Sequence, residues 1–106
     1  MKRFQMLKDD DSVIEFNSRT PREAALKAAS RDESQIILVN ESKLHIFRGS
    51  KKLIAENGHT EFTLKNKIKF KPFVDKMYYT DLKRQVDIKR KSDISFIRDV
   101  LRDAYV

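Results

Sequence analysis

The feature that most constrains the fold is a short helix specified by residues 20–31 (TPREAALKAASR). Thr20 is placed to accept the backbone N–H of Glu23, Glu23 to reach back to the N–H of Thr20, and Pro21 suits the first helical position. Four small residues make one side of this helix nearly smooth: Ala24, Ala25, Ala28 and Ala29. Because so little side chain would separate the two backbones, we expect this helix to lie close against a sheet.

Runs that alternate between polar and apolar residues predict strands on both sides of the helix. Residues 2–8 and 13–17 predict a first hairpin, joined through the turn-forming residues 9–12. The β-branched run 35–40 predicts a buried strand, and residues 43–48 (KLHIFR) predict the strand that returns beside it.

The following stretch has a weaker pattern. Gly49 interrupts the alternation, and Asn57-Gly58 is a strong turn signal, so residues 49–66 predict a small protruding hairpin or a mobile arm. Residues 67–82 alternate again and predict one long or bent strand, with Pro72 at an edge or a bulge.

The chain closes with a basic segment and a helix. Residues 83–91 (KRQVDIKRK) hold five basic residues, and Ser92 or Asp93 is expected to cap an amphipathic helix that packs on the barrel or on a second copy of itself. The predicted fold is α+β: a small sheet or open barrel of about five strands, with one helix between strands 2 and 3 and a C-terminal helix. We expect one domain over 1–82 and an extension over 83–106.

Composition excludes several classes of protein. The 106 residues fit one domain, and the absence of cysteine excludes disulfides and thiolate metal sites. The apolar run 36–39 is too short to span a membrane, and the N-terminus lacks the apolar core of a signal peptide. With 23 Lys and Arg against 16 Asp and Glu, the net charge of +7 predicts attraction to polyanions.

The residues that commonly carry catalysis are sparse. His45 and His59 have no cysteine partner and no metal-binding spacing, and no glycine-rich phosphate loop is present. Residues 9–11 are three adjacent aspartates without the alternation of a calcium loop, so a solvated turn is expected. We expect no enzyme activity, no cofactor and no metal.

Basic residues interleaved with apolar ones are the positive signal. In residues 67–71 (KIKFK) three lysines share one face of a strand, which is typical of a guarded sheet edge or of a DNA-facing strand. Residues 48–71 carry one Arg and six Lys against two Glu. Lysine binds phosphate as a point charge and reads guanine poorly, so this pattern favours backbone recognition over base recognition.

Taken together, four segments resemble the methanogen chromosomal protein family, small archaeal non-histone proteins also found in some viruses. The segments are residues 20–31, 43–48 and 71–76 (KPFVDK) and the opening hairpin with Phe4 and Phe16. The resemblance covers about residues 2–77. It implies a small β pseudo-barrel of five strands with one helix, so that 1–82 is a pseudo-barrel DNA-binding domain. It also implies a monomeric, non-enzymatic, architectural protein of the nucleoid or the virion that bends and compacts double-stranded DNA.

The resemblance also implies a DNA-binding face. By matching position it comprises Arg3, Arg22, Lys51, Lys71 and Pro72, with Arg19 and Lys43 keeping the charge of basic family positions. The basic arm and the strand after it add three further lysines: Lys52, Lys67 and Lys69.

The chain departs from the family in its arm and at its end. The family's arm carries tryptophans and prolines, whereas Ser50 replaces one tryptophan here, and Phe62 or Leu64 is the candidate wedge between base steps. Residues 78–106 extend beyond the family's usual end.

We therefore predict a protein that binds double-stranded DNA with little sequence preference, as a monomer or as a dimer through 92–106, with no membrane partner. Two alternatives stay open: a protein-interaction adaptor that uses its C-terminal helix, and an RNA-binding small barrel.

Overall fold

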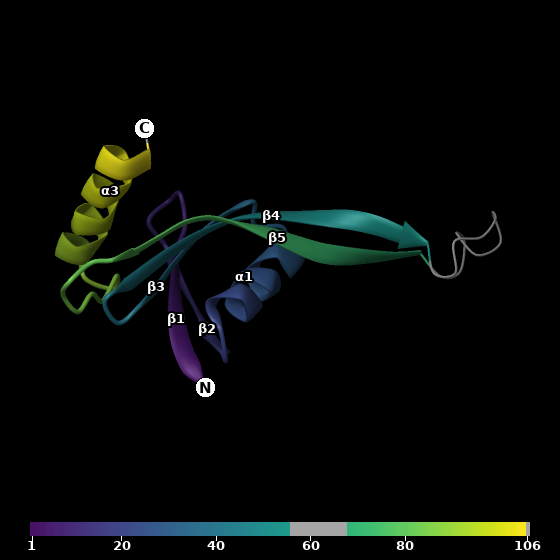
Figure 1. The fold of residues 1–106 in the computed structure, drawn as a ribbon, viewed down its shortest axis with the longest axis horizontal. Coiled ribbons are helices and arrows are strands. Elements are labelled where there is room, and N and C mark those ends of the chain that lie inside the picture. Colours follow the sequence, from purple (N-terminus) through teal and green to yellow (C-terminus); the bar gives the residue numbers. More distant parts are fainter. Residues whose placement is uncertain (56–67, 106) are drawn as a thin grey trace.

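The computed structural model describes residues 1–55 and 68–105, and gives the backbone alone for 53–55, 68–70 and 104–105. Seven elements follow one another within these described residues (Figure 1): β1 (Lys2–Leu7), β2 (Val13–Ser18), α1 (Pro21–Ser30), β3 (Gln35–Asn40), β4 (Lys43–Ala55), β5 (Ile68–Asp81) and α3 (Lys91–Tyr105). The candidate wedge residues Phe62 and Leu64, and Lys67, lie outside the described residues. None of the described helices has the length and apolar character needed to cross a bilayer.

The five strands form one antiparallel sheet in the order β2-β1-β3-β4-β5. Both predicted hairpins are present, with Phe4 opposite Phe16 in the first and Ile37 opposite Ile46 in the second. The α+β class, the five strands, the helix after the second strand and the C-terminal helix are thereby confirmed.

The expectation of a barrel is wrong, because the sheet is open. In the described chain β2 and β5 are the two edges and do not pair with each other. The helix α1 occupies the face across which they would have to meet, and it contacts β2, β3, β4 and β5. Its side chains reach both edges: Arg22 Nη2 donates to the carbonyl of Val74 in β5 at 3.3 Å, and Lys27 Nζ donates to the carbonyl of Asn17 in β2.

The small-residue face of α1 forms the first core, as predicted. All four alanines are fully buried against Phe4, Met6, Ile36, Leu38 and Phe47. The capping box is confirmed in one half, since Thr20 Oγ1 accepts the N–H of Glu23 at 3.2 Å. The other half differs: the Glu23 carboxylate accepts the N–H of Arg19, one residue earlier than predicted.

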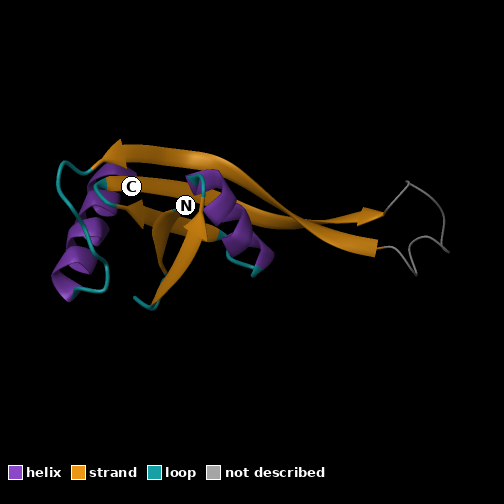
Figure 2. Cartoon of the chain, turned by 90° about the horizontal axis from the view of Figure 1, so that it is seen from below, coloured by secondary structure: helices purple, strands orange, loops and turns teal. Residues whose placement is uncertain are grey.

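The second face of the sheet is covered by the C-terminal segment. Side chains from β1, β3 and β4 pack there against the linker and α3 in a second core: Leu7, Ile37, Val39, Leu44, Val86, Ile88 and Ile97. The two helices thus lie on opposite faces of the sheet (Figure 2), since the two cores alternate along β3. The division into domains at residue 82 stays a prediction, although the segment after it shares this core.

The start of α3 differs from the prediction. The helix begins at Lys91, so neither Ser92 nor Asp93 is its cap. The buried Asp93 carboxylate instead holds the linker, accepting from Arg84 Nη2 at 2.9 Å and from the N–H of Asp87 at 2.8 Å. Gln5 in β1 completes the attachment, because its amide donates to Asp87 Oδ1 and accepts the N–H of Ile88.

Strand β4 continues past Gly49, where the sequence pattern predicted a break. Its pairing with β3 ends at Arg48, whereas its pairing with β5 runs on to Ala55 and Ile68. Residues 49–55 and 68–74 therefore project as a two-stranded ribbon beyond the rest of the sheet (Figures 1 and 2). We call this pair of segments the ribbon.

Gly49 lies at a close approach to β4 by the C-terminal turn of α1 and the residues just before β3. A methyl group there would lie 2.5 Å from the carbonyl oxygen of Glu33 and 3.0 Å from the Ala29 side chain. We expect Gly49→Ala to lower the free energy of unfolding by about 1–3 kcal/mol, because the backbone of residue 33 would have to move. Urea denaturation measures it. Ser50→Ala, an exposed neighbour, is the matched control, with a change within about 0.5 kcal/mol. Equal stability of both variants would contradict the packing described.

Candidate nucleic-acid interface

The ribbon carries charge of one sign. Its two segments hold Lys51, Lys52, Lys69 and Lys71 and no acidic residue. Lys52 and Lys71 are directly opposite one another, and their ammonium groups lie 4.8 and 5.9 Å from the centre of the Phe73 ring. The ring supports the aliphatic stems of both lysines on one face of the ribbon, so two exposed charges project there together.

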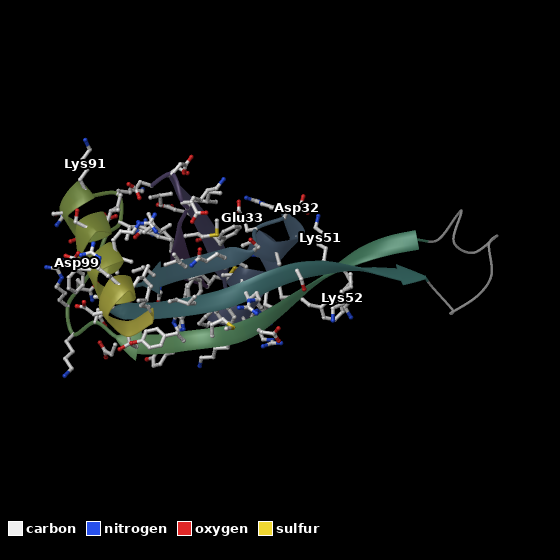
Figure 3. All side chains as sticks on the ribbon, turned by 90° about the horizontal axis from the view of Figure 1, so that it is seen from above. Asp32, Glu33, Lys51, Lys52, Lys91 and Asp99 are labelled. Atoms are coloured by element: carbon white, nitrogen blue, oxygen red, sulfur yellow. The ribbon has the colours of Figure 1, made fainter. Side chains whose placement is uncertain are left out.

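The other face of the ribbon is different. Lys51 Nζ lies 3.1 Å from Asp32 Oδ1, just after α1, and Figure 3 shows the two side chains beside one another. The charge of Lys51 is therefore partly compensated, in contrast to that of Lys52 on the opposite side. Pro72 lies opposite Lys51 in β5. This strand is an edge of the sheet, which is where a residue without a backbone N–H is tolerated. Of Lys69 only the backbone is described.

A hollow of about 250 Å³ lies where β1, β4 and β5 meet the first residue of α1. We call it the basic hollow. Its lining contains three lysines, one histidine and no carboxylate: Lys2, Phe4, Pro21, Asn40, Lys43, His45, Lys76 and Tyr79. Within the described chain none of the three lysines forms an ion pair. The result is a concave surface of uncompensated positive charge.

His45 forms part of the floor of this hollow and is buried. Its ring packs edge-on against Phe4 and lies 4.9 Å from the ring of Tyr79. Burial lowers the pKa of His45 from 6.5 to about 4, with further lowering by the charges of Lys76, Lys43 and Lys2. The imidazole is therefore neutral at neutral pH.

The remaining predicted residues are divided between the two faces. Arg22 lies in the first turn of α1 and reaches β5 through its bond to Val74, and Arg19 is exposed just before the helix. Arg3 faces the opposite side, where it lines a hollow of about 470 Å³ together with Lys2 and Arg90. That second hollow also contains carboxylates, so its charge is mixed.

Of the residues that line the basic hollow, the sequence predicted Lys43 as a binding residue. It did not predict Lys2, Lys76 and Tyr79. Lys76 ends the KPFVDK segment, and its ammonium group lies 5.2 Å from the centre of the Tyr79 ring. Strict alternation would place these two side chains on opposite faces. A bulge at Met77, between the pairs Phe47–Lys76 and Ile46–Tyr78, returns them to one face.

The acidic turn at residues 9–11 serves the fold. Asp10 accepts from the N–H and the hydroxyl of Ser12, and Asp11 binds Arg98 of α3 at 2.8 Å. Over residues 1–55 and 68–105 no cluster of His, Cys, Asp and Glu suits a metal ion.

Comparison with known proteins gives no relative. No family model, no curated protein and no solved structure matches the chain. The resemblance to the methanogen chromosomal protein family stays a prediction, and function is inferred here from charge and geometry.

The buried His45 makes stability depend on pH. Its pKa is about 4 in the folded chain and near 6.5 when exposed, so unfolding takes up a proton between these values. We expect the free energy of unfolding to fall from pH 6.5 toward pH 4, by at most about 1.4 kcal/mol per pH unit from this group. Urea denaturation at several pH values measures the slope. In His45→Gln the slope is expected to be smaller, and an identical slope in both proteins would contradict the assignment.

Proposed function

We propose that the protein binds double-stranded DNA through its phosphate backbone, as a non-enzymatic architectural protein. One observation carries the proposal: the edge strand β5 presents uncompensated lysines at two places on its two faces, Lys71 on the ribbon and Lys76 at the basic hollow. They are five positions apart, or about 16 Å of extended strand, so the ribbon and the basic hollow provide two separate contacts for the phosphate backbone.

The chemistry of these side chains supports recognition with little sequence preference. Lysine ammonium groups bind phosphate as point charges, and the bidentate arginine pattern that reads guanine is absent from the described ribbon side chains and the basic hollow. The ribbon projects away from both cores, so it is free to follow a groove or a backbone. The function implied by the family resemblance is the same.

Bending and compaction of DNA belong to this proposal. A projecting ribbon and a basic surface at its base contact DNA at two places, and a bend allows both contacts at once. Energy transfer between labels at the two ends of a duplex tests it, since bending brings the labels together. An unchanged transfer efficiency on saturation with protein would refute bending while leaving DNA binding intact.

The alternatives differ in what they need from the structure. An adaptor would bind its partner through the C-terminal helix, but Ile97 of that helix is fully buried and its apolar neighbours pack into the second core. This packing also buries apolar side chains of α3 that a dimer through this helix would use. An RNA-binding role uses the same lysines, and competition between duplex DNA and single-stranded RNA distinguishes the two ligands.

Affinity for a duplex is expected to depend steeply on salt. A set of about 6–10 phosphate contacts loses roughly 10³–10⁵ in affinity between 50 and 200 mM salt. Titration of a fluorescent duplex by anisotropy at several salt concentrations measures it. A response independent of salt would refute binding through the phosphate backbone.

The paired lysines of the ribbon provide a sharper test. We expect Lys52→Gln combined with Lys71→Gln to reduce the slope of log affinity against log salt by about 1.8, because two phosphate contacts are lost. The loss is expected to be equal on unrelated sequences. The matched control is Lys83→Gln with Lys91→Gln, which removes the same charge from exposed positions outside the ribbon and the hollow. Equal losses in the two double variants would argue against a specific role for the ribbon.

A further inference from the structure

The basic hollow differs from the ribbon in being concave and in having a titratable floor. Its three ammonium groups come from three strands, Lys2 from β1, Lys43 from β4 and Lys76 from β5. The carboxylate of Asp81, which is paired with Lys43 in the sheet, accepts the N–H of Lys83 and does not line the hollow. The three lysines thus line one hollow to which the described chain contributes no counter-ion.

The surroundings of this site favour an anion on every side that the structure describes. Pro21, the first residue of α1, lines the hollow, so the positive end of the helix dipole adds to the lysine charges. His45 and Tyr79 line the hollow with two uncharged rings that are tilted against one another. Burial is the main reason that the imidazole is neutral, and the three lysine charges add to it; an anion that offsets these charges therefore favours protonation of the imidazole.

We infer that the basic hollow seats a backbone phosphate of bound duplex DNA over His45, and that the seated phosphate favours uptake of a proton from solvent by the imidazole. This inference rests on the proposed function. It adds a defined phosphate position at the base of the ribbon and couples DNA binding to pH.

The coupling follows from the charges that face His45. Lys2, Lys43 and Lys76 oppose its protonation, Tyr79 and Phe4 are uncharged, and a seated phosphate brings the only negative charge among these groups. By linkage, a proton taken up on binding makes affinity rise as the pH falls. Affinity is expected to depend on pH mainly between the pKa of His45 in the free protein and its pKa in the complex.

The direct test is a titration of His45 by NMR, with ¹³C-labelled histidine in a His59→Gln background so that one signal remains. In the free protein the pKa is expected at about 4. With saturating 20-base-pair duplex it is expected at about 5 or above, because a neighbouring opposite charge moves a pKa by roughly one or more. An unchanged pKa in the complex overturns the inference. A rise with poly-glutamate but none with duplex also overturns it, in favour of an acidic protein partner.

Variants separate this inference from the proposed function. Lys76→Gln is expected to reduce the salt slope by about 0.9 and to abolish most of the rise in the His45 pKa on binding. Lys91→Gln, an exposed lysine of α3 outside the hollow (Figure 3), is the control that keeps the rise. If the unmodified chain fails to bind duplex at 50 mM salt, the proposed function fails. If it binds duplex but Lys76→Gln has the same salt slope and the same rise in the His45 pKa as Lys91→Gln, only the inference of a phosphate in the basic hollow is refuted.

Discussion

A central strand that is apolar on both faces is the constraint on which this structure depends. In β3, Ile36 and Leu38 point to one face and Ile37 and Val39 to the other, and all four are at most 1% exposed. Each such side chain stabilises the fold by about 1.5–3 kcal/mol when it is buried. The sheet therefore needs a cover on each face. The alanine face of α1 supplies one, and the linker with α3 supplies the other.

This double cover decides where charge can gather. The faces over β1 and β3 are occupied by the cores, so exposed lysines collect on the ribbon and where β1, β4 and β5 meet. The basic run at 83–91 shows the difference between a charge count and a charged surface. Arg84 stacks on Phe96 and pairs with Asp93, while Lys89 pairs with Glu15. Much of that run attaches the second cover to the sheet, although its composition alone resembles a polyanion site.

The candidate site was predictable only in part. Lys43, Lys52 and Lys71 belong to strands whose pairing follows from local alternation, and the structure places them on exposed basic surfaces. Arg3 is predicted on the same face but lies on the other side of the sheet, because its neighbour in β1, Phe4, fills the α1 core and successive side chains of a strand alternate. Lys76 and Tyr79 share a face through the bulge at Met77, and a period of two cannot reveal a single extra residue.

The sequence by itself determined the local structure: the capped helix with its small face, the two hairpins, the amphipathic C-terminal helix and the excess of positive charge. These features depend on residues a few positions apart, whose spacing and backbone preferences act without the rest of the chain. Only the tertiary structure decided that the sheet stays open, that α3 covers its second face, and that Lys2, Lys43 and Lys76 surround one hollow. Those outcomes depend on contacts between segments that are distant in the sequence, such as the hydrogen bonds of Gln5 to the linker. The periodicity of a strand specifies which of its sides is apolar, but it does not specify which other segment will cover that side.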